Sequence, residues 1–465
     1  MSLSTDNQYF LSQFNALASQ FLSELDTRQV AQLHTSAPEM SLLQEEQSNE
    51  GAVELLCQHV LPYLSASAGP RYWGFVTGGA NPAALFADWL VSTFDQNVSK
   101  DGDSIASAVE RQTLVWLRDL FYLPTTFEGI ITTGATSANF LGAVIAREYA
   151  GKQQAIDVSQ QGMQGLSVEI FSACPHASMI KSLGFAGFGQ QQITTVTTID
   201  GTETMDASHL AQLLSESSAK SKIVIASCAT VTATSFDDLP VISALCKEHL
   251  AWLHVDAAFG IFERLVNGEH GKTQGIDLAD SITLDFHKWL NVPYDAGAIF
   301  TRHPDIHVKS CNVDAPYLAN DEPFPAFLSL GIENSRRFRA LPIWLTLVKY
   351  GRDGITAWVA RNIDLAKELA TWFDQQDNFE LVIECQLNVV VFRPVAKGLN
   401  KEQSDVLTRT FLQRLNEAGV VFLSAGSWQG NQVIRAALSN WQTTREDIEL
   451  AKSSLQDCFS ALMSK

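Results

Sequence analysis

The chain has 465 residues, of which 46% are hydrophobic and 18% are charged, and its formal net charge is −19. Such a composition is typical of a globular protein with a large core and excludes a disordered, collagen-like or coiled-coil chain. An acidic surface of this strength repels phosphate backbones, so we expect no nucleic acid partner.

The cysteines and the hydropathy pattern indicate where such a protein works. Seven cysteines are scattered along the chain without a CxxC pair, which favours neither a disulfide framework nor a zinc ribbon. The first residues, MSLSTDNQYF, lack a basic stretch followed by an apolar run. The longest uncharged span, residues 129–146, is too rich in Ser, Thr and Asn for a membrane helix. We therefore expect a cytoplasmic protein with no metal site and no membrane partner.

The first two thirds of the chain predict a helical arm followed by an α/β unit. Residues 1–65 place apolar side chains at three- and four-residue intervals, which predicts helices that pack on another element or on a partner chain. Residues 66–104, which include RYWGFVTGGANP, are interrupted by turn formers. From about 105 to 302 strands and helices alternate, which predicts a mostly parallel sheet with helices on both faces. The expected strands are 168–171, 193–199, 223–227, 252–256, 281–284 and 297–300, and the expected helices include 138–149 and 240–249.

The last third of the chain has a different pattern. Helices are expected at 341–350 and 355–375, followed by strand-like runs at 380–392, 420–423 and 433–438 and a closing helix at 444–463. This order predicts a smaller α+β unit. We thus divide the chain into an N-terminal helical arm (1–65), a large α/β domain (66–340) and a small C-terminal α+β domain (341–465).

The first segment with chemical potential is IITTGATSAN, residues 130–139, an apolar run that breaks into small residues and opens a helix. The free N–H groups at such a helix start, with the hydroxyls of Thr136 and Ser137, can hold a phosphate. A capped helix without a ligand explains the same residues. No GxxxxGK[ST], GxGxxG after a strand, HExxH or GxSxG motif is present, so the usual nucleotide, metalloprotease and serine hydrolase sites are not indicated.

Two further segments place ionisable residues at strand ends, where open α/β sheets bind ligands. In WLHVDAA (252–258) the carboxylate of Asp256 ends an apolar strand and needs a partner, either a cationic ring nitrogen or an Arg or Lys of the same protein. In SITLDFHKW (281–289) Lys288 follows a strand directly. A lysine in an apolar setting can act as a nucleophile towards a carbonyl, whereas a surface lysine has no such role.

Together these three segments match the needs of pyridoxal phosphate (PLP): a helix start for the phosphate, an acid for the pyridinium nitrogen and a lysine for the aldehyde. The sequence resembles the group II PLP-dependent decarboxylases, the family of aromatic amino acid, glutamate and cysteine sulfinate decarboxylases. The resemblance extends from about Pro70 to Leu438 and is strongest where HVDAA and HKW are separated by 32 positions (288 − 256). The other matching motifs are PRY (70–72), ACPHAS (173–178), SFDDL (235–239) and RRFRAL (336–341).

The resemblance implies the type I fold of PLP-dependent enzymes (aspartate aminotransferase-like), PLP as the cofactor and a decarboxylase activity. It makes Lys288 the lysine that forms a Schiff base with the cofactor, Asp256 the partner of the ring nitrogen and His176 the histidine that stacks on the ring. These three are the expected catalytic residues. The remaining cofactor-binding positions that it implies are Gly134, Ala135, Thr136, Thr230, Ala258, Asp285 and His287.

The same resemblance suggests a reaction and a substrate pocket. The substrate amine displaces Lys288, carbon dioxide leaves, and Asp256 keeps the ring nitrogen protonated so that the ring accepts electrons. The pocket would use Trp73, Phe75, Val76, Thr77 and Arg435, with Phe94 to Asn97 supplied by the second subunit of a homodimer. Aromatic pocket residues favour an aromatic amino acid. Arg435 or Gln96 could instead serve an acidic substrate, Arg435 could form a structural salt bridge, and diaminobutyrate is a third candidate substrate.

Three departures from the family pattern affect the expected product. Asp285 stands where many relatives carry Asn, and Ala229-Thr230-Val231 replaces Gly-Thr-Thr. No tyrosine lies between Tyr317 and Arg336, and an ungapped pairing puts Phe327, rather than Phe324, at the position of the loop tyrosine that delivers a proton to Cα. Relatives with that change make aldehydes, so either another acid such as His176 protonates Cα or the product is an aldehyde. An aminotransferase and a non-catalytic PLP-binding protein are the competing classes.

Overall fold

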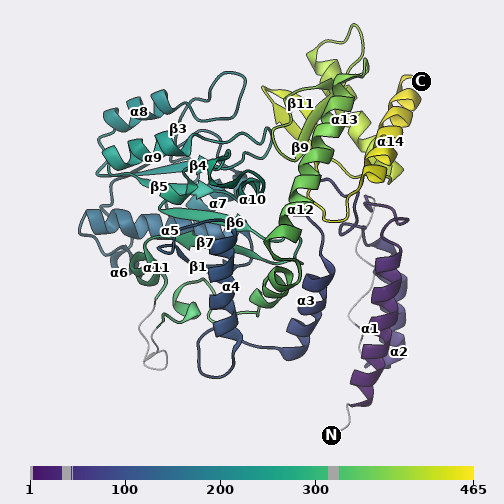
Figure 1. Ribbon diagram of the computed structural model, residues 1–465, viewed down its shortest axis with the longest axis horizontal. Coiled ribbons are helices and arrows are strands. Elements are labelled where there is room, and N and C mark those ends of the chain that lie inside the picture. Colours follow the sequence, from purple (N-terminus) through teal and green to yellow (C-terminus); the bar gives the residue numbers. More distant parts are fainter. Residues whose placement is uncertain (1–3, 34–42, 44, 313–323, 465) are drawn as a thin grey trace.

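The computed structural model describes residues 4–33, 43, 45–312 and 324–464 (Figure 1). Its larger sheet has seven strands in the order β1-β7-β6-β5-β4-β2-β3. Only β7 runs antiparallel to its neighbours, so the sheet is mostly parallel as predicted. The strands are β1 (Glu128–Thr132), β2 (Val168–Ser172), β3 (Ile193–Thr195), β4 (Ser221–Ser227), β5 (Trp252–Asp256), β6 (Ser281–Asp285) and β7 (Gly297–Thr301).

The helices of this unit cover the sheet and bury its apolar side chains. Helix α5 (Ala135–Gln153) packs across β4, β5, β6 and β7, while α4 (Ala106–Leu120) contacts β1 and α9 (Leu239–Glu248) contacts β5. All five residues of β5 and of β6 are buried. The remaining helices of this unit are α3 (Pro82–Phe94), α6 (Val158–Gln161), α7 (Ala177–Phe185), α8 (Ala207–Glu216), α10 (Arg264–Asn267) and α11 (Pro304–Cys311). Of these, α3 and α10 pack on α12 (Ala340–Asp374).

The C-terminal part forms an antiparallel sheet in the order β10-β11-β9-β8, at the upper right in Figure 1. Its strands are β8 (Phe379–Leu381), β9 (Val389–Pro394), β10 (Ser424–Trp428) and β11 (Asn431–Ala437). Helices α12 (Ala340–Asp374), α13 (Lys401–Ala418) and α14 (Arg445–Met463) accompany it. Helix α12 joins the two helices expected separately and bends at Gly351, whose φ is 58°.

Several expected elements differ from the structure. The run 380–392 is two strands, β8 and β9, and residues 420–423 precede β10 because Phe422 pairs there with Tyr72 in an isolated bridge. Strand β3 ends at Thr195, since the backbone of Ile199 closes a turn with Thr204. The sequence interpretation had identified no helix where α13 lies. The three-part division at residues 65 and 340 stays a prediction.

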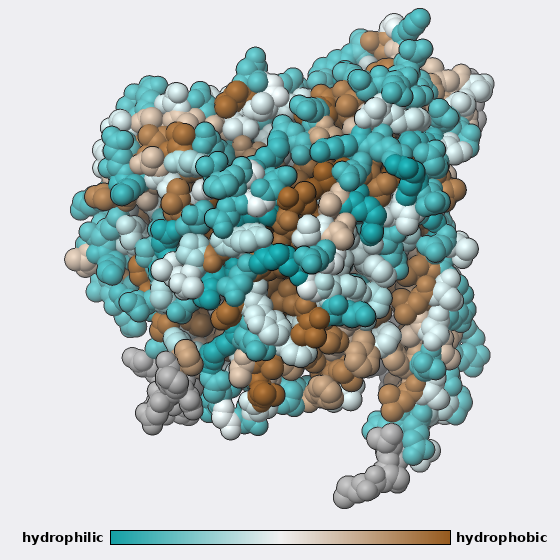
Figure 2. All heavy atoms as spheres, in the orientation of Figure 1, coloured by the Kyte–Doolittle hydropathy of each residue, from teal (hydrophilic) through white to brown (hydrophobic). Residues whose placement is uncertain are grey.

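The N-terminal arm consists of α1 (Thr5–Ser23) and α2 (Asn49–His59), and neither helix buries a residue. Figure 1 shows this pair beside α3 and apart from the two sheets. Hydrophobic surface gathers over α1 and α3 in Figure 2. On α1, Phe10 and Phe14 are 43% and 42% exposed. Within the described residues, no helix combines the length and apolar character needed to cross a membrane.

Candidate active site

The candidate site lies where β5 and β6 end side by side. Asp256 is the last residue of β5, Asp285 is the last residue of β6, and Lys288 follows three residues later. Lys288, Asp256 and His176 all line one pocket. The structure therefore brings together the three residues predicted to be catalytic. The other lining residues are Phe75, Val76, Ala135, Cys174, Ser178, Ser227, Ala229, Thr230, Val231, Ala258 and Phe259.

Lys288 is held at the pocket wall by its backbone and its side chain. Its Nζ lies 3.7 Å from Oδ2 of Asp285 and 5.6 Å from the centre of the Phe259 ring, and the side chain is 20% exposed. The carbonyl oxygen of Lys288 packs so closely on Gly78 that a Cβ there would lie only 1.8 Å from it. The amine therefore reaches the pocket from a fixed backbone.

Asp256 is a buried carboxylate with two hydrogen-bond donors. The backbone N–H of Ala258 donates to Oδ1 at 3.2 Å, and the side-chain amide of Asn139 donates to Oδ2 at 2.9 Å. Among the residues that the structure describes, Asp256 forms no ion pair with a Lys or Arg. A buried carboxylate of this kind suits a cationic ligand group, because an unpaired buried charge is costly. The alternative of an internal Arg or Lys partner is not supported.

His176 is the N-cap residue of α7 and accepts hydrogen bonds at Nδ1. The backbone N–H of Ser178 donates to Nδ1 at 3.2 Å, and the Ser178 hydroxyl lies 2.7 Å away. Part of the ring is exposed to the pocket, yet the protein around it desolvates the ring, and this lowers the pKa of His176 below its ordinary value. The positive charges of Lys288 and Arg435 act in the same direction, while Asp256 opposes them. These effects favour the neutral imidazole.

The predicted phosphate turn lies beside the lysine segment. Gly134 has φ 131°, and a Cβ there would lie 2.7 Å from Cε1 of His287. Helix α5 starts after Gly134 with no side-chain cap, so its first N–H groups stay available for an anion. Thr136 in this turn is exposed. The additional carboxylate at Asp285 has its Oδ1 3.0 Å from Nε2 of His287 and its Oδ2 3.7 Å from Nζ of Lys288.

Not all of the predicted substrate residues reach the pocket. Phe75 and Val76 line it, but Trp73 is 1% exposed and packs in the core of the small sheet, where its Nε1 donates to the Pro70 carbonyl at 2.7 Å. The interpretation of Trp73 as a substrate contact is thus wrong for this chain. Thr77 donates to the Gly74 carbonyl and lies outside the lining, as do residues 94–97.

Arg435 on β11 is 5% exposed and, like Thr77, lies outside the lining of this pocket. Its Nε and Nη2 have no hydrogen-bond partner among the described residues. Burial lowers its pKa to about 10. The alternative role, a structural salt bridge, is not seen among the described residues, whose ion pairs do not include Arg435. A buried guanidinium with open donors suits a carboxylate ligand.

The structure corrects the assignment of Phe327 to a loop position. Phe327 is 1% exposed and begins a short 3-10 helix, Phe327–Ser329. Its ring packs against the guanidinium groups of Arg111 and Arg336, at 4.8 and 4.9 Å. Phe327 is therefore a core residue and not a pocket residue. Tyr317 lies outside the described residues.

Sequence reasoning assigned no role to Asn139 or His254, which contact the site from behind. His254 Nε2 lies 3.0 Å from Oδ1 of Asn139, and Asn139 in turn reaches Asp256. One signal was present in the sequence: residues two apart in a strand face the same side, so His254 shares the face of Asp256. Which helix residue meets that face depends on the packing of α5.

Comparison with known proteins agrees with this geometry. Residues 35–395 match the pyridoxal-dependent decarboxylase conserved domain. The chain is similar to an aromatic-L-amino-acid decarboxylase of Bacillus atrophaeus (29% identity over 85% of this chain and 82% of the relative). It is also similar to an L-2,4-diaminobutyrate decarboxylase of Acinetobacter baumannii (28% identity over 74% and 71%). The fold matches the crystal structure of Oryza sativa TDC with PLP and tryptamine, with a TM-score of 0.91, 20% identity and coverage of 100% and 99%.

The fold and the site define a PLP-dependent carboxy-lyase of the type I fold. The chain belongs to the pyridoxal-dependent decarboxylase family. The residues present fit PLP: a lysine at a pocket wall, a buried carboxylate without an internal cation, and a helix start without a side-chain cap.

Proposed function

We propose that this protein decarboxylates an aromatic L-amino acid to the corresponding amine and carbon dioxide. The observation that carries the proposal is the convergence of Lys288, Asp256 and His176 on one pocket that Phe75 and Phe259 also line. Phe75 is 61% exposed there and lies 6.1 Å from Phe422, which stacks on Tyr72 at 4.6 Å. Such a cluster offers apolar contact to a flat side chain.

The residues have separable tasks. Bound PLP would supply an aldehyde and an electron-withdrawing ring. Lys288 would hold the aldehyde, Asp256 would face the ring nitrogen, and the start of α5 would bind the phosphate. His176 is proposed to lie against the ring and to hold a proton near Cα. Val76, Ala258 and Phe259 add apolar surface to the pocket wall beside Lys288.

An acidic substrate is the second candidate, and Arg435 is the observation that favours it. Its two unpartnered nitrogens could bind a side-chain carboxylate as well as the α-carboxylate. A panel of aromatic, acidic and diamino acids, assayed for carbon dioxide release, separates the candidates. An aromatic preference that persists in Arg435→Lys supports the main proposal, whereas turnover confined to glutamate or cysteine sulfinate contradicts it.

The nature of the product needs its own measurement. The amine, ammonia and hydrogen peroxide are to be quantified in the same reaction. Amine in equal amount to carbon dioxide, without peroxide, is the expected result. Aldehyde with one equivalent each of ammonia and peroxide would instead show decarboxylation coupled to oxidative deamination. Transfer of the amino group to an oxo acid without carbon dioxide release would indicate an aminotransferase.

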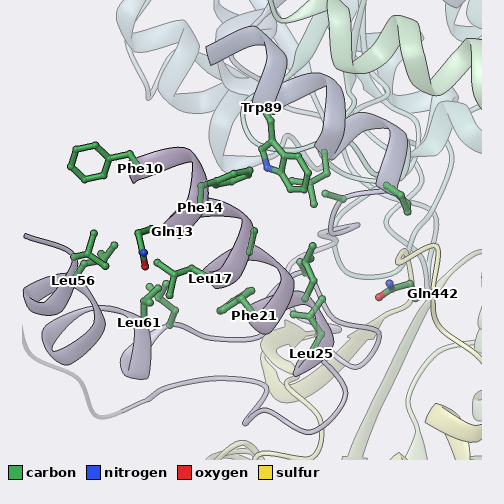
Figure 3. Close-up of a pocket in the computed structure, with 18 of the residues that line it drawn as sticks. Phe10, Gln13, Phe14, Leu17, Phe21, Leu25, Leu56, Leu61, Trp89 and Gln442 are labelled. Carbon is green, nitrogen blue, oxygen red and sulfur yellow. The ribbon is translucent and has the colours of Figure 1, made fainter. Parts of the chain in front are cut away.

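We infer a homodimer in which the arm covers a second copy of the chain. Helices α1, α2 and α3 line an apolar groove of about 990 Å³, shown in Figure 3. In this view Phe14 points to Trp89 of α3, and their ring centres lie 5.0 Å apart. Arm helices that bury none of their own residues need a partner surface to be stable. Light scattering of the purified protein should give twice the mass of the chain, and Phe14→Asp with Phe21→Asp should lower it.

We also infer a cytoplasmic location. All seven cysteines are free, and the most buried of them have thiol pKa values raised by burial. Unpaired, protonated thiols are typical of a reducing compartment. Fractionation of cells that produce a tagged chain tests this inference.

The cofactor assignment is tested with Lys288→Ala. The wild-type protein should be yellow and should lose its visible band with borohydride, whereas the variant should not. A Lys288→Ala protein that releases carbon dioxide at the wild-type rate would refute the proposal.

A further inference from the structure

A chain of hydrogen bonds runs behind the pocket from β5 to α7. It begins at Trp252, whose Nε1 donates to Oγ of Ser281 at 3.2 Å, and Ser281 lies 2.8 Å from Nδ1 of His254. His254 Nε2 lies 3.0 Å from Oδ1 of Asn139. Asn139 then donates from Nδ2 to two acceptors, Oδ2 of Asp256 and Oγ of Ser178.

The chemistry of each group fixes the direction of every bond in this chain. Because Asn139 uses its amide hydrogens on Asp256 and Ser178, its carbonyl oxygen must accept, and His254 must carry its proton on Nε2. Nδ1 of His254 then accepts from the Ser281 hydroxyl, which already receives the indole N–H of Trp252. Burial lowers the pKa of His254, in agreement with a neutral ring.

The branch through Ser178 ends on His176. Ser178 Oγ accepts from Asn139 at 3.1 Å, so its own hydrogen is free for Nδ1 of His176 at 2.7 Å. The backbone N–H of Ser178 donates to the same nitrogen. Nδ1 of a neutral His176 is therefore an acceptor, and its hydrogen is on Nε2.

Asn139 is the branch point of this network and is completely buried. It lies on the first turns of α5, three residues before Gly142, where a Cβ would come within 2.5 Å of the His254 ring. The close approach of α5 to β5 thus places one amide against both a carboxylate and a hydroxyl. No other residue in the described part of the chain donates to both Asp256 and Ser178.

We propose that Asn139 is a positioning residue that orients Asp256 and, through Ser178, holds His176 as the Nε2–H tautomer. This inference rests on the proposed PLP-dependent function, because it concerns the two side chains that would face the cofactor ring. Asn139 itself does not line the pocket. Its two branches are separable, since Ser178 can be changed without removing the donor to Asp256.

Two measurements on the purified protein test the two branches. The first is the affinity of the apoprotein for PLP, followed by absorbance, which reports on Asp256. Loss of one hydrogen bond to a charged group predicts at least tenfold weaker binding for Asn139→Ala. Ser178→Ala should weaken PLP binding less than Asn139→Ala does, because it leaves Asp256 with both donors although Ser178 itself lines the pocket.

The second measurement is the ring ¹⁵N spectrum of histidine-labelled apoprotein, with the His176 signals assigned by their loss in His176→Gln. The wild type should show the Nε2–H tautomer. Because the backbone N–H of Ser178 still donates to Nδ1 in both variants, Asn139→Ala and Ser178→Ala should each show a partial shift towards the Nδ1–H tautomer. Ser178→Thr, which keeps the hydroxyl, should give the wild-type spectrum. This signal requires neither PLP nor activity.

Asn416→Ala is the matched control, since Asn416 also bonds through both ends of its amide, but to the backbone of Leu423 just before β10. It should leave both readouts unchanged while showing any general effect of a buried Asn→Ala change on thermal unfolding. Wild-type PLP affinity and a wild-type His176 spectrum in folded Asn139→Ala would overturn the inference. Failure of the wild-type protein to bind PLP would instead refute the proposed function.

Discussion

The contact between Gly78 and the Lys288 carbonyl gives the sharpest mutational prediction. A Cβ at residue 78 would lie 1.8 Å from the Lys288 oxygen, with the Asn291 side chain 2.9 Å away. Real Cβ atoms stay at least 3.0 Å from such neighbours, so Gly78→Ala must move the two backbones apart by at least 1.2 Å (3.0 − 1.8). Displacement of a reacting group by about 1 Å can cost on the order of 100-fold in rate. We expect Gly78→Ala to lower kcat for carbon dioxide release by about that factor or more.

The stability cost of the same change is expected at about 1–3 kcal/mol, the usual range for overpacking. The assay combines carbon dioxide release, the visible absorbance of bound PLP and thermal unfolding. Gly51→Ala is the control, because a Cβ at that position would meet its nearest neighbour at an ordinary 3.5 Å. If Gly78→Ala keeps wild-type turnover and absorbance, the argument that residue 78 fixes the lysine backbone is incorrect.

Three further predictions follow from buried groups. Glu110 and Arg336 form a fully buried ion pair at 2.7 Å, so Glu110→Gln should lower the free energy of unfolding in urea by about 3–5 kcal/mol. The double variant Glu110→Leu with Arg336→Met should regain most of that stability. A double variant as unstable as Glu110→Gln would contradict this prediction. Burial lowers the pKa of His307 from 6.5 to about 4. Between these pH values the native state binds fewer protons at His307 than the unfolded state does, so the free energy of unfolding falls as the pH is lowered from 6.5 to about 4. His307→Gln should therefore reduce the slope of unfolding free energy there by about 1.4 kcal/mol per pH unit, and an unchanged slope would show that His307 is not responsible. Phe327→Tyr should leave the ratio of amine to aldehyde unchanged and destabilise the fold by about 1–3 kcal/mol, because the hydroxyl enters the core; a changed product ratio would restore Phe327 to the site.

Much of the site follows from local sequence. Asp256 and Lys288 were predicted because each follows an apolar strand, and parallel strands end at the same edge of a sheet. The start of α5 was predicted from small residues after an apolar run. The mostly parallel sheet was predicted from the alternation of strands and helices, and five of the six expected strands overlap the observed strands to within two residues at each end. His176 was predicted only from the resemblance of the whole sequence to the decarboxylase family. The residues next to His176 in the sequence would by themselves indicate an ordinary turn histidine.

Only the tertiary structure decided how distant segments meet. Trp73 and Phe327 both stand in aromatic stretches near the predicted pocket, but the first packs into the small core and the second lies between Arg111 and Arg336. Asn139 acquires its position from the close packing of α5 on β5, which brings residues 117 positions apart into hydrogen-bonding distance. Periodicity reports which face of an element is buried, because it depends on neighbours along the chain. The identity of the residue that covers this face depends on contacts between segments far apart in the sequence. No local sequence pattern specifies those contacts.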